Sequence, residues 1–189
     1  MKRLPFDEIN ALEQEVQAFF TDKNRAIPSV SVFEDLVLDL LIVAYVNGVD
    51  DVAEMIGEVE RPDVTDMYRV INTPVAGETF HTRIAKYVRE QNADDIARVI
   101  DTETHRVYNT AVYNTASKVQ TQTGKKLMKR WETMLDDRVR DTHEPLQGVE
   151  IPFDEKFYTF DGDSARFPGD FSLPENVCNC RCALTVFEA

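Results

Sequence analysis

The sequence predicts an α+β fold in which a mainly helical N-terminal part packs on a small C-terminal region of short β-strands and ordered loops. Apolar residues recur at three- and four-residue steps through most of the first 119 residues, which is the spacing of an amphipathic helix. The last sixty residues instead hold four of the eight prolines, many turn residues and two short apolar runs of strand length. With 43% hydrophobic residues in 189, the chain can bury one sizeable core.

Six stretches of the N-terminal part have helical patterns. The run at residues 31–47 is apolar almost all round and is longer than a typical strand, so we expect a helix at the centre of the helical layer. Asn47 and Gly48 suit its C-terminal cap, and Asn92 suits the N-terminal cap of the last helix. The predicted helices are residues 7–20, 31–47, 50–59, 64–71, 78–90 and 93–119.

A break near Arg61-Pro62 marks a domain boundary in the sequence. It divides an N-terminal helical region, residues 1–60, from a second domain over residues 61–189. In the second domain, alternating or continuous apolar residues predict three short strands, at residues 131–135, 149–153 and 182–187.

The formal net charge of −13 makes the chain a poor general binder of nucleic acid, because phosphate neutralisation needs lysine and arginine. Residues 118–140 are a local exception, with seven Lys/Arg against three Asp/Glu. The cluster in this segment either contacts DNA or an acidic partner, or forms a solvated flexible loop. It consists of Lys125, Lys126, Lys129 and Arg130.

The chain carries no pattern for export or membrane insertion. The N-terminal residues become polar at once, without the apolar core of a signal peptide. The most apolar run, residues 36–46, is interrupted by Asp39 and is well short of the roughly 20 residues that a span needs. We therefore expect assembly in the cytosol and no membrane partner.

Four side chains form a candidate zinc set, because thiolates and imidazole suit a tetrahedral zinc ion. They are His143, Cys178, Cys180 and Cys182. The C-x-C spacing is less usual for zinc than C-x-x-C, and no second cysteine pair is present. The alternative is reduced, half-buried cysteines at a strand start, with the histidine hydrogen-bonded to a carboxylate.

The segment DDRVRDTH, residues 136–143, is a candidate for catalysis. His143 near carboxylates suits a general base, and Arg138 and Arg140 suit stabilisation of phosphate charge, as in a metal-independent nuclease. The alternative, which we favour, is a network of Arg–Asp pairs that fixes this irregular segment. We expect Glu103 and Asn109 likewise to tie their helix to a loop. Walker, dinucleotide and common hydrolase motifs are absent.

Six pieces of the sequence, in order, carry a resemblance to a known family. They are GETFHTRIAKY at 77–87, TETHRVYNTAVYNTA at 102–116, KRWETMLDDRVRDTHEPLQG at 129–148, PFDEKF at 152–157, FPGD at 167–170 and NCRCALTV at 179–186. Together they make residues 65–189 similar to the phage Mu protein F-like family of minor head or head-morphogenesis proteins. The second domain, residues 61–189, is thereby identified as a Mu F-like domain.

The resemblance implies a structural role and no enzyme activity. Family members associate with the portal and the procapsid interior, so the implied partners are the portal protein, the scaffold or the major capsid protein, together with DNA. The implied location is the host cytoplasm during assembly, then the virion head interior or portal vertex. No small-molecule substrate is implied. The alternative remains a nuclease or phage-borne effector enzyme that uses His143 with Arg138 and Arg140.

The resemblance also assigns signature positions, none of which the family defines as catalytic. They are Glu103, Asn109, Trp131, Asp137, Arg138, Arg140, His143, Gly148, Asn179, Cys180, Arg181 and Cys182. Many relatives have C-x-x-C where this chain has residues 140–143, and a histidine where this chain has Val177. That richer set resembles a zinc site, of which this chain keeps only part. Relatives often have a longer helical N-terminal part as well.

Overall fold

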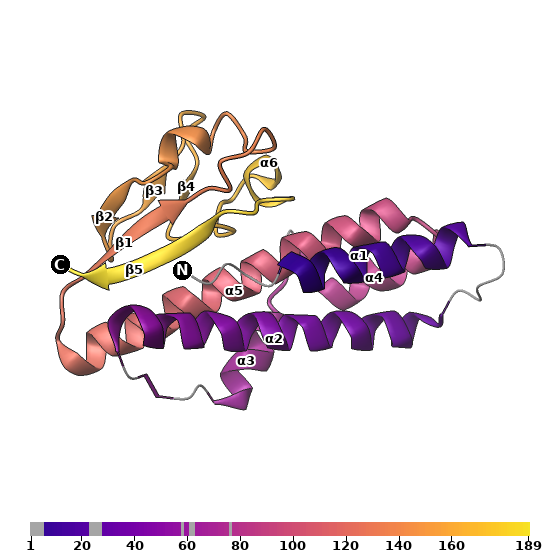
Figure 1. Cartoon of the computed structure of the whole chain (residues 1–189), viewed down its shortest axis with the longest axis horizontal. Helices are drawn as coiled ribbons and strands as arrows, with labels where there is room; N and C mark the ends of the chain where they lie inside the picture. The colour runs from indigo at the N-terminus through magenta and orange to yellow at the C-terminus, as the bar shows by residue number, and fades with distance from the viewer. Residues whose placement is uncertain (1–5, 23–27, 58, 61–62, 76) are drawn as a thin grey trace.

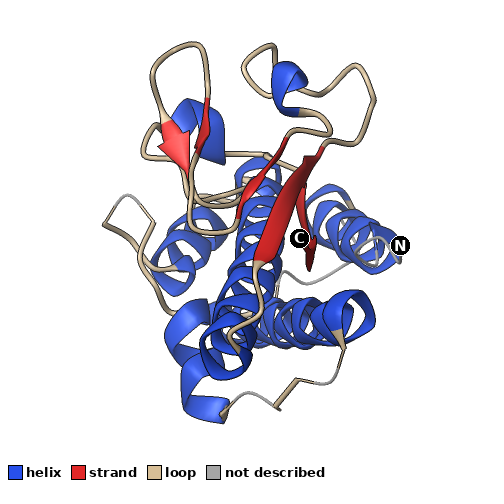
Figure 2. Ribbon diagram, turned by 90° about the vertical axis from the view of Figure 1, so that its left-hand side faces the viewer, coloured by secondary structure: helices blue, strands red, loops and turns tan. Residues whose placement is uncertain are grey.

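A layer of helices lies beneath a small strand region in the computed structural model (Figure 1). The structure describes residues 6–22, 28–57, 59–60, 63–75 and 77–189. Seen from the side, the strands lie over one face of the helices (Figure 2). This arrangement confirms the predicted α+β class, with a helical N-terminal part and short antiparallel strands in the C-terminal region.

The helices largely follow the apolar periodicity of the sequence. The long ones are α1 (Phe6–Thr21), α2 (Val30–Ile56) and α5 (Ala93–Thr123), and the shorter ones are α3 (Val64–Ile71), α4 (Phe80–Arg89) and α6 (Pro174–Val177). Asn92 caps α5 as predicted, because its side chain accepts a hydrogen bond from the backbone N–H of Asp95 at 3.1 Å. Among these described helices, none is both long and apolar enough to cross a membrane.

The prediction of a helix end at Asn47-Gly48 is wrong, because α2 continues through both residues to Ile56. Gly48 marks a close crossing with α5 instead. A Cβ atom at this position would lie 2.6 Å from the carbonyl oxygen of Tyr108 and 2.9 Å from Cβ of Ala111. The glycine therefore allows two backbones to approach more closely than any other residue would permit.

Three strands form an antiparallel sheet in the order β2-β1-β5. Their bounds are Leu127–Glu132 for β1, Glu150–Pro152 for β2 and Ala183–Glu188 for β5. A two-stranded hairpin, β3 (Phe157–Tyr158) and β4 (Ser164–Ala165), lies beside them. The predicted strand at 131–135 is misplaced, because β1 begins four residues earlier and includes much of the basic cluster.

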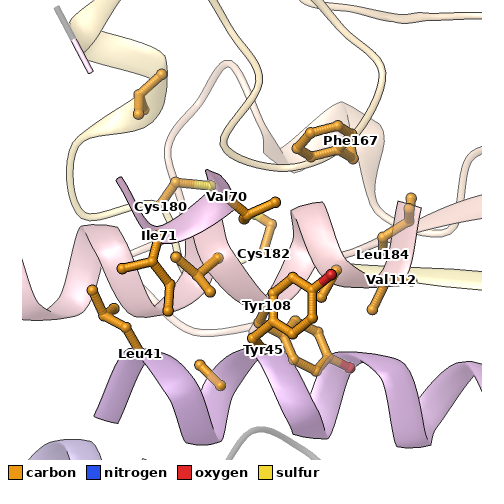
Figure 3. Packing of buried hydrophobic residues seen from close by; sticks show 14 of the residues in the cluster. Leu41, Tyr45, Val70, Ile71, Tyr108, Val112, Phe167, Cys180, Cys182 and Leu184 are labelled. Atoms are coloured by element: carbon orange, nitrogen blue, oxygen red, sulfur yellow. The ribbon is translucent and has the colours of Figure 1, made fainter. Parts of the chain in front are cut away.

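One core joins the helices to the sheet. Residues of α2, α5 and β5 belong to it, among them Leu41, Tyr108 and Leu184 (Figure 3). Side chains before residue 60 are buried in the same cluster as those after it. The division at residue 60 therefore does not separate two cores.

Candidate functional site

A buried ion network joins three helices at the base of the site. Glu103 of α5 is fully buried and pairs with Arg83 of α4 and Arg106 of α5. Nε and Nη2 of Arg106 donate to the Glu103 carboxylate at 2.9 and 2.6 Å. Arg106 also donates to the carbonyl oxygens of Val70 and Ile71 at 3.1 and 3.2 Å, where α3 ends. The predicted role of Glu103 in tying its helix to a neighbouring segment matches this geometry.

Asn109 connects α5 to strand β5. Its Oδ1 accepts a hydrogen bond from the backbone N–H of Leu184 at 2.8 Å, and its Nδ2 donates to the carbonyl oxygen of Cys182 at 2.9 Å. About two turns earlier on α5, the hydroxyl of Thr102 accepts from the backbone N–H of Asn179 at 2.9 Å. Asn179 has a φ of 56°, a conformation that asparagine tolerates better than most residues. These bonds fix the segment before β5 along the helix.

Two irregular segments meet above α5, and we call residues 136–148 and 178–184 together the clasp. His143, Cys180 and Cys182 converge there, all at least 96% buried. The two sulfur atoms each lie 3.7 Å from Nδ1 of His143. The three ligand atoms all lie within 4.8 Å of one another, and among the described residues they are the set that suits a metal ion.

The three side chains fit a tetrahedral zinc ion. Ideal zinc–sulfur and zinc–nitrogen bonds at the tetrahedral angle place sulfur and nitrogen about 3.6 Å apart. Both observed separations are 3.7 Å. Cys178, the fourth predicted ligand, is not part of this cluster. Its backbone carbonyl instead accepts a hydrogen bond from Arg140, and its half-buried side chain lines a groove on the helical side.

The two clasp thiols have unequal affinities for a proton. A hydrogen bond from Cys182 lowers the pKa of Cys180 well below its usual value, and His143 contributes in the same direction against the opposing effect of burial. The pKa of Cys182 is raised, because its S–H donates to Cys180 and because it is buried. The arrangement therefore favours one thiolate, the form of cysteine that binds metals.

Access to His143 is too narrow for a polymeric substrate. A cavity of about 10 Å³ lies beside His143 and Cys182, which is room for about one water molecule. Arg138 points into solvent with a side chain that is 72% exposed, while Arg140 is bonded to the Cys178 carbonyl. Both arginines line this cavity together with His143, but its volume leaves no room for a phosphodiester, which weighs against the nuclease alternative.

The acidic partner within the clasp is Asp136, not the predicted Asp137. Arg181 donates two parallel hydrogen bonds to the Asp136 carboxylate, at 2.8 and 2.6 Å. These bonds lower the pKa of Asp136 to about 2. Asp137 is exposed, because the turn directs its neighbour toward Arg181. Within residues 136–143 the described Arg–Asp contact is Arg138 near Asp136 at 3.9 Å, while Arg140 bonds to a carbonyl and Asp136 is held mainly by Arg181.

Trp131 packs against the imidazole ring of His143. Its fully buried ring lies edge-on to His143 at 5.4 Å between centroids and contacts Phe157 and Phe171 at 5.1 and 5.5 Å. Gly148 lies at the end of the long segment between β1 and β2 and has a φ of 72°. Its backbone N–H donates to the Trp131 carbonyl at 2.8 Å. Among the described residues, none forms a hydrogen bond with the indole N–H of Trp131 or with Nε2 of His143.

The expectation of a DNA contact at Lys129 is wrong, because this side chain is fully buried. Its ammonium group donates to the carbonyl oxygens of Glu155 and Arg166, the latter at 2.8 Å. It also lies within 5.5 Å of the ring centroids of Tyr113, Phe153 and Phe157. Lys129 therefore joins the sheet to the loops that follow it. Sequence reasoning missed this role, because a lysine in a charged run is typically exposed.

The other basic residues do not form one exposed patch with it. Lys125 pairs with Glu188, and Arg130 pairs with Glu132 and Glu150. Lys126 is exposed. Arg130 belongs to strand β1 and Lys125 lies just before it, and both are paired with acids. The segment is therefore mostly strand instead of a flexible loop, and its paired cations do not form a free cationic surface.

We expect Lys129→Met to remove a rise of stability with pH. Burial lowers the pKa of Lys129 to about 8, whereas an unfolded lysine titrates near about 10.4. Between these values the unfolded chain binds more protons, so stability rises with pH. From pH 7 to 9 the wild type should gain about 1.3 kcal/mol relative to the variant. Urea unfolding at both pH values measures this difference.

The exposed Lys126→Met variant is the matched control, and its stability should follow that of the wild type at both pH values. An unchanged pH dependence in Lys129→Met would show that the native ammonium keeps its ordinary proton affinity.

Asp163 is a second structural centre that the sequence analysis missed. Its carboxylate accepts hydrogen bonds from the backbone N–H groups of Ser164, Ser172 and Leu173, and from the side chain of Asn176. Although burial raises the pKa of this carboxyl, the hydrogen bonds outweigh it and lower the pKa well below its usual value. The turn sequence DGDS was the available signal. Asp163 thereby orders the segment that leads into α6.

Comparison with known proteins places these features in a family. Residues 68–185 match the family Phage Mu protein F like protein. The chain is 33% identical over 113 residues to the minor head protein GP7 of Bacillus phage SPP1, an alignment that covers 58% of this chain and 36% of GP7. No solved structure matches the chain at a significant level.

A second relative is the NAD(+)--arginine ADP-ribosyltransferase EFV of Enterococcus faecalis (strain ATCC 700802 / V583), with 32% identity over 143 residues. That alignment covers 60% of this chain and 29% of the relative. The chain thus spans about a third of the length of the curated relatives it matches. The family match covers more than half of the chain and includes the Glu103 network and both segments of the clasp, so this chain belongs to the phage Mu protein F-like family.

Proposed function

We propose that the protein is a minor head protein of a phage or prophage and assists procapsid assembly and DNA packaging through contact with the portal or the scaffold. It acts in the host cytoplasm during assembly and then in the head interior or at the portal vertex. The family match over residues 68–185 carries this proposal, and the likeness to GP7 supports it.

The geometry of the signature residues supports a structural role. Glu103 and Asn109 turn inward and bond to neighbouring segments of the same chain. Arg140 and Arg181 do the same within the clasp. These groups stabilise the fold and leave its surface free for protein contacts.

Co-sedimentation tests the structural function. The purified protein is mixed with portal rings and, separately, with the scaffold and major capsid proteins encoded in the same genomic neighbourhood. We expect it to sediment with the portal rings or the scaffold at micromolar concentration, and not with portal rings of an unrelated phage. Absence of the protein from all pelleted assemblies would contradict the proposal.

An enzyme is the second candidate, because one relative is named as an ADP-ribosyltransferase. The buried position of His143 weighs against a nuclease. The discriminating assay incubates the protein with plasmid DNA, with RNA, and with NAD⁺ plus an arginine-containing acceptor. We expect no turnover in any of the three. Turnover that disappears in His143→Ala, with the fold intact by circular dichroism, would replace the structural function.

We infer that the clasp binds one zinc ion through Nδ1 of His143 and the sulfur atoms of Cys180 and Cys182. The carrying observation is the pair of 3.7 Å separations between each sulfur and the ring nitrogen. A zinc ion would link the two segments of the clasp, which are distant in sequence, and would compensate for the charge of buried thiolates. The small cavity beside the cluster has room for a water molecule as the fourth ligand.

Elemental analysis of protein purified without chelator tests the zinc site. We expect about one equivalent of zinc in the wild type and in Cys178→Ser, the matched control outside the cluster. Cys180→Ser and Cys182→Ser should each lose most of it. Cobalt substitution provides a second measurement, because thiolate ligands give intense absorption. A wild-type content below about 0.2 equivalents would rule the site out.

A further inference from the structure

A groove of about 220 Å³ lies where the helical layer meets the segment around α6. Figure 1 shows α6 at one end of the strand region, above the helices. Arg83 and Tyr87 of α4 and Arg98 of α5 line its helical side. Phe171 and Cys178 belong to its opposite wall. The groove is therefore formed jointly by the two layers, and its lining does not include His143, Cys180 or Cys182.

Two guanidinium groups give the groove a supply of hydrogen-bond donors. Nη2 of Arg83 donates to Glu103, but Nε of Arg83 is enclosed with no acceptor among the described residues. The Arg83 side chain is only 13% exposed, so it is a rigid part of the wall. Arg98 is 44% exposed and pairs with Asp95, which leaves further N–H donors available. A carboxylate is the group that such planar donors recognise best in proteins.

The rest of the lining is mainly apolar. Val99 and Val177 are buried, and Tyr87 and Pro174 add ring surface at the rim. The volume is below the roughly 300–1,000 Å³ of sites for drug-sized ligands. It suits a single large apolar side chain of a bound segment, and the burial of that side chain supplies the affinity. The arginine side would recognise an acidic residue next to it in the bound segment.

We propose that this groove binds a segment of a partner protein that presents one large apolar side chain next to an aspartate or glutamate. The proposal deepens the proposed function and rests on it for the source of the partner, namely another head protein. It assigns the carboxylate to Arg98, whose side chain is the more exposed of the two, and the apolar side chain to Tyr87, Val99 and Val177, while Arg83 fixes the wall through its pair with Glu103.

Nucleic acid does not match the same chemistry. A phosphodiester backbone is bound by rows of cations and brings no apolar group to fill the groove. Glu78 stands among the lining residues, and the chain as a whole carries a net charge of −13. The combination of two arginines with an apolar lining therefore favours a protein segment.

Cys178 provides a direct readout, because its half-buried thiol is in the groove wall while the other two cysteines are buried. The probe is the peptide acetyl-Glu-Leu-Phe-Asp-Glu-amide. Alkylation of Cys178 by iodoacetamide is followed by peptide mass spectrometry. At about ten times the dissociation constant, the probe should slow alkylation about tenfold. A peptide with the acids replaced by Gln and Asn, and one with Leu-Phe replaced by Ser-Ser, should not protect at that concentration.

Variants of the groove complete the test. Arg98→Gln should weaken peptide binding about fivefold, whereas Arg89→Gln, an exposed arginine of α4 outside the groove, should leave it unchanged. Tyr87→Ala should weaken binding while the circular dichroism spectrum and melting curve confirm that the variant is folded. Because Arg98 is exposed, its substitution leaves the folded state testable even if Tyr87→Ala is unstable.

Four outcomes would overturn the proposal. They are absence of protection by the probe, equal protection by the uncharged peptide, protection by a single-stranded oligonucleotide instead, and self-association that Phe160→Ser abolishes. The last would assign the groove to a second copy, whose Phe160 is 73% exposed. Portal or scaffold binding that persists without peptide protection would remove this inference and leave the proposed function standing.

Discussion

Glu103→Ala should destabilise the protein by about 3 to 5 kcal/mol, because it leaves two buried arginines without their carboxylate. Glu103 is completely buried, and the side chains of Arg83 and Arg106 are only 13% and 7% exposed. Neither cation can regain full hydration in place. Urea or thermal unfolding at pH 7 measures the loss.

Two further variants separate the loss of the buried charge from the loss of any glutamate. Glu90→Ala removes an exposed glutamate at the end of α4 and should change stability by less than about 0.5 kcal/mol. Glu103→Gln keeps the shape and one acceptor oxygen, but it loses the charge and turns an NH2 donor toward one arginine. We expect a loss smaller than that of Glu103→Ala but well above that of Glu90→Ala. A loss below about 1 kcal/mol in Glu103→Ala would mean that the arginines reorient into solvent, and the network would then not hold α3, α4 and α5 together.

Gly48→Ala should cost about 2 to 3 kcal/mol, although alanine is normally the better helix residue by about 1 kcal/mol. The new methyl group would lie 2.6 Å from the backbone carbonyl oxygen of Tyr108, which cannot move without displacing α5. Chemical denaturation of the variant gives the value. Asp50→Ala, at an exposed position of the same helix, is the control and should have little effect.

A double variant separates the two contacts at this crossing. Ala111→Gly removes the side-chain atom 2.9 Å from the new methyl group but leaves the Tyr108 carbonyl in place. We therefore expect Ala111→Gly to recover less than half of the loss caused by Gly48→Ala. Full recovery would show that side-chain crowding alone, and not the backbone approach, requires the glycine.

The helices were predictable because each buries one face, so the apolar spacing in the sequence records the structure. The exceptions have a common cause. Asn47-Gly48 has the sequence of a helix end, but the glycine is required by Tyr108 and Ala111 of α5, which lie far along the chain. Strand β1 was placed too late because Lys129 occupies an inward position, and only the distant carbonyls of Glu155 and Arg166 make that position suitable for a lysine.

The sequence predicted most residues of the site, but it predicted less well which of them contact one another. The sequence placed His143, Cys180 and Cys182 among the candidates, but it could not exclude Cys178, whose side chain lines the groove by the helices. It named Asp137 where Asp136 binds Arg181, because neighbouring acids in a turn differ only in the direction the backbone gives them. Arg83 was missed altogether, since its partner Glu103 is twenty residues away on another helix.

The antiparallel pairing of β1 with β5 has a consequence for synthesis on the ribosome. Strand β5 follows every other described element of the fold, yet its backbone pairs with β1 and donates a hydrogen bond to the side chain of Asn109. The helices can pack as they emerge, whereas the sheet and the cysteine–histidine cluster wait for residues 180–188. Until then, the surfaces of Trp131 and α5 that β5 covers stay exposed. The newly made chain is therefore most prone to aggregation just before those residues are added.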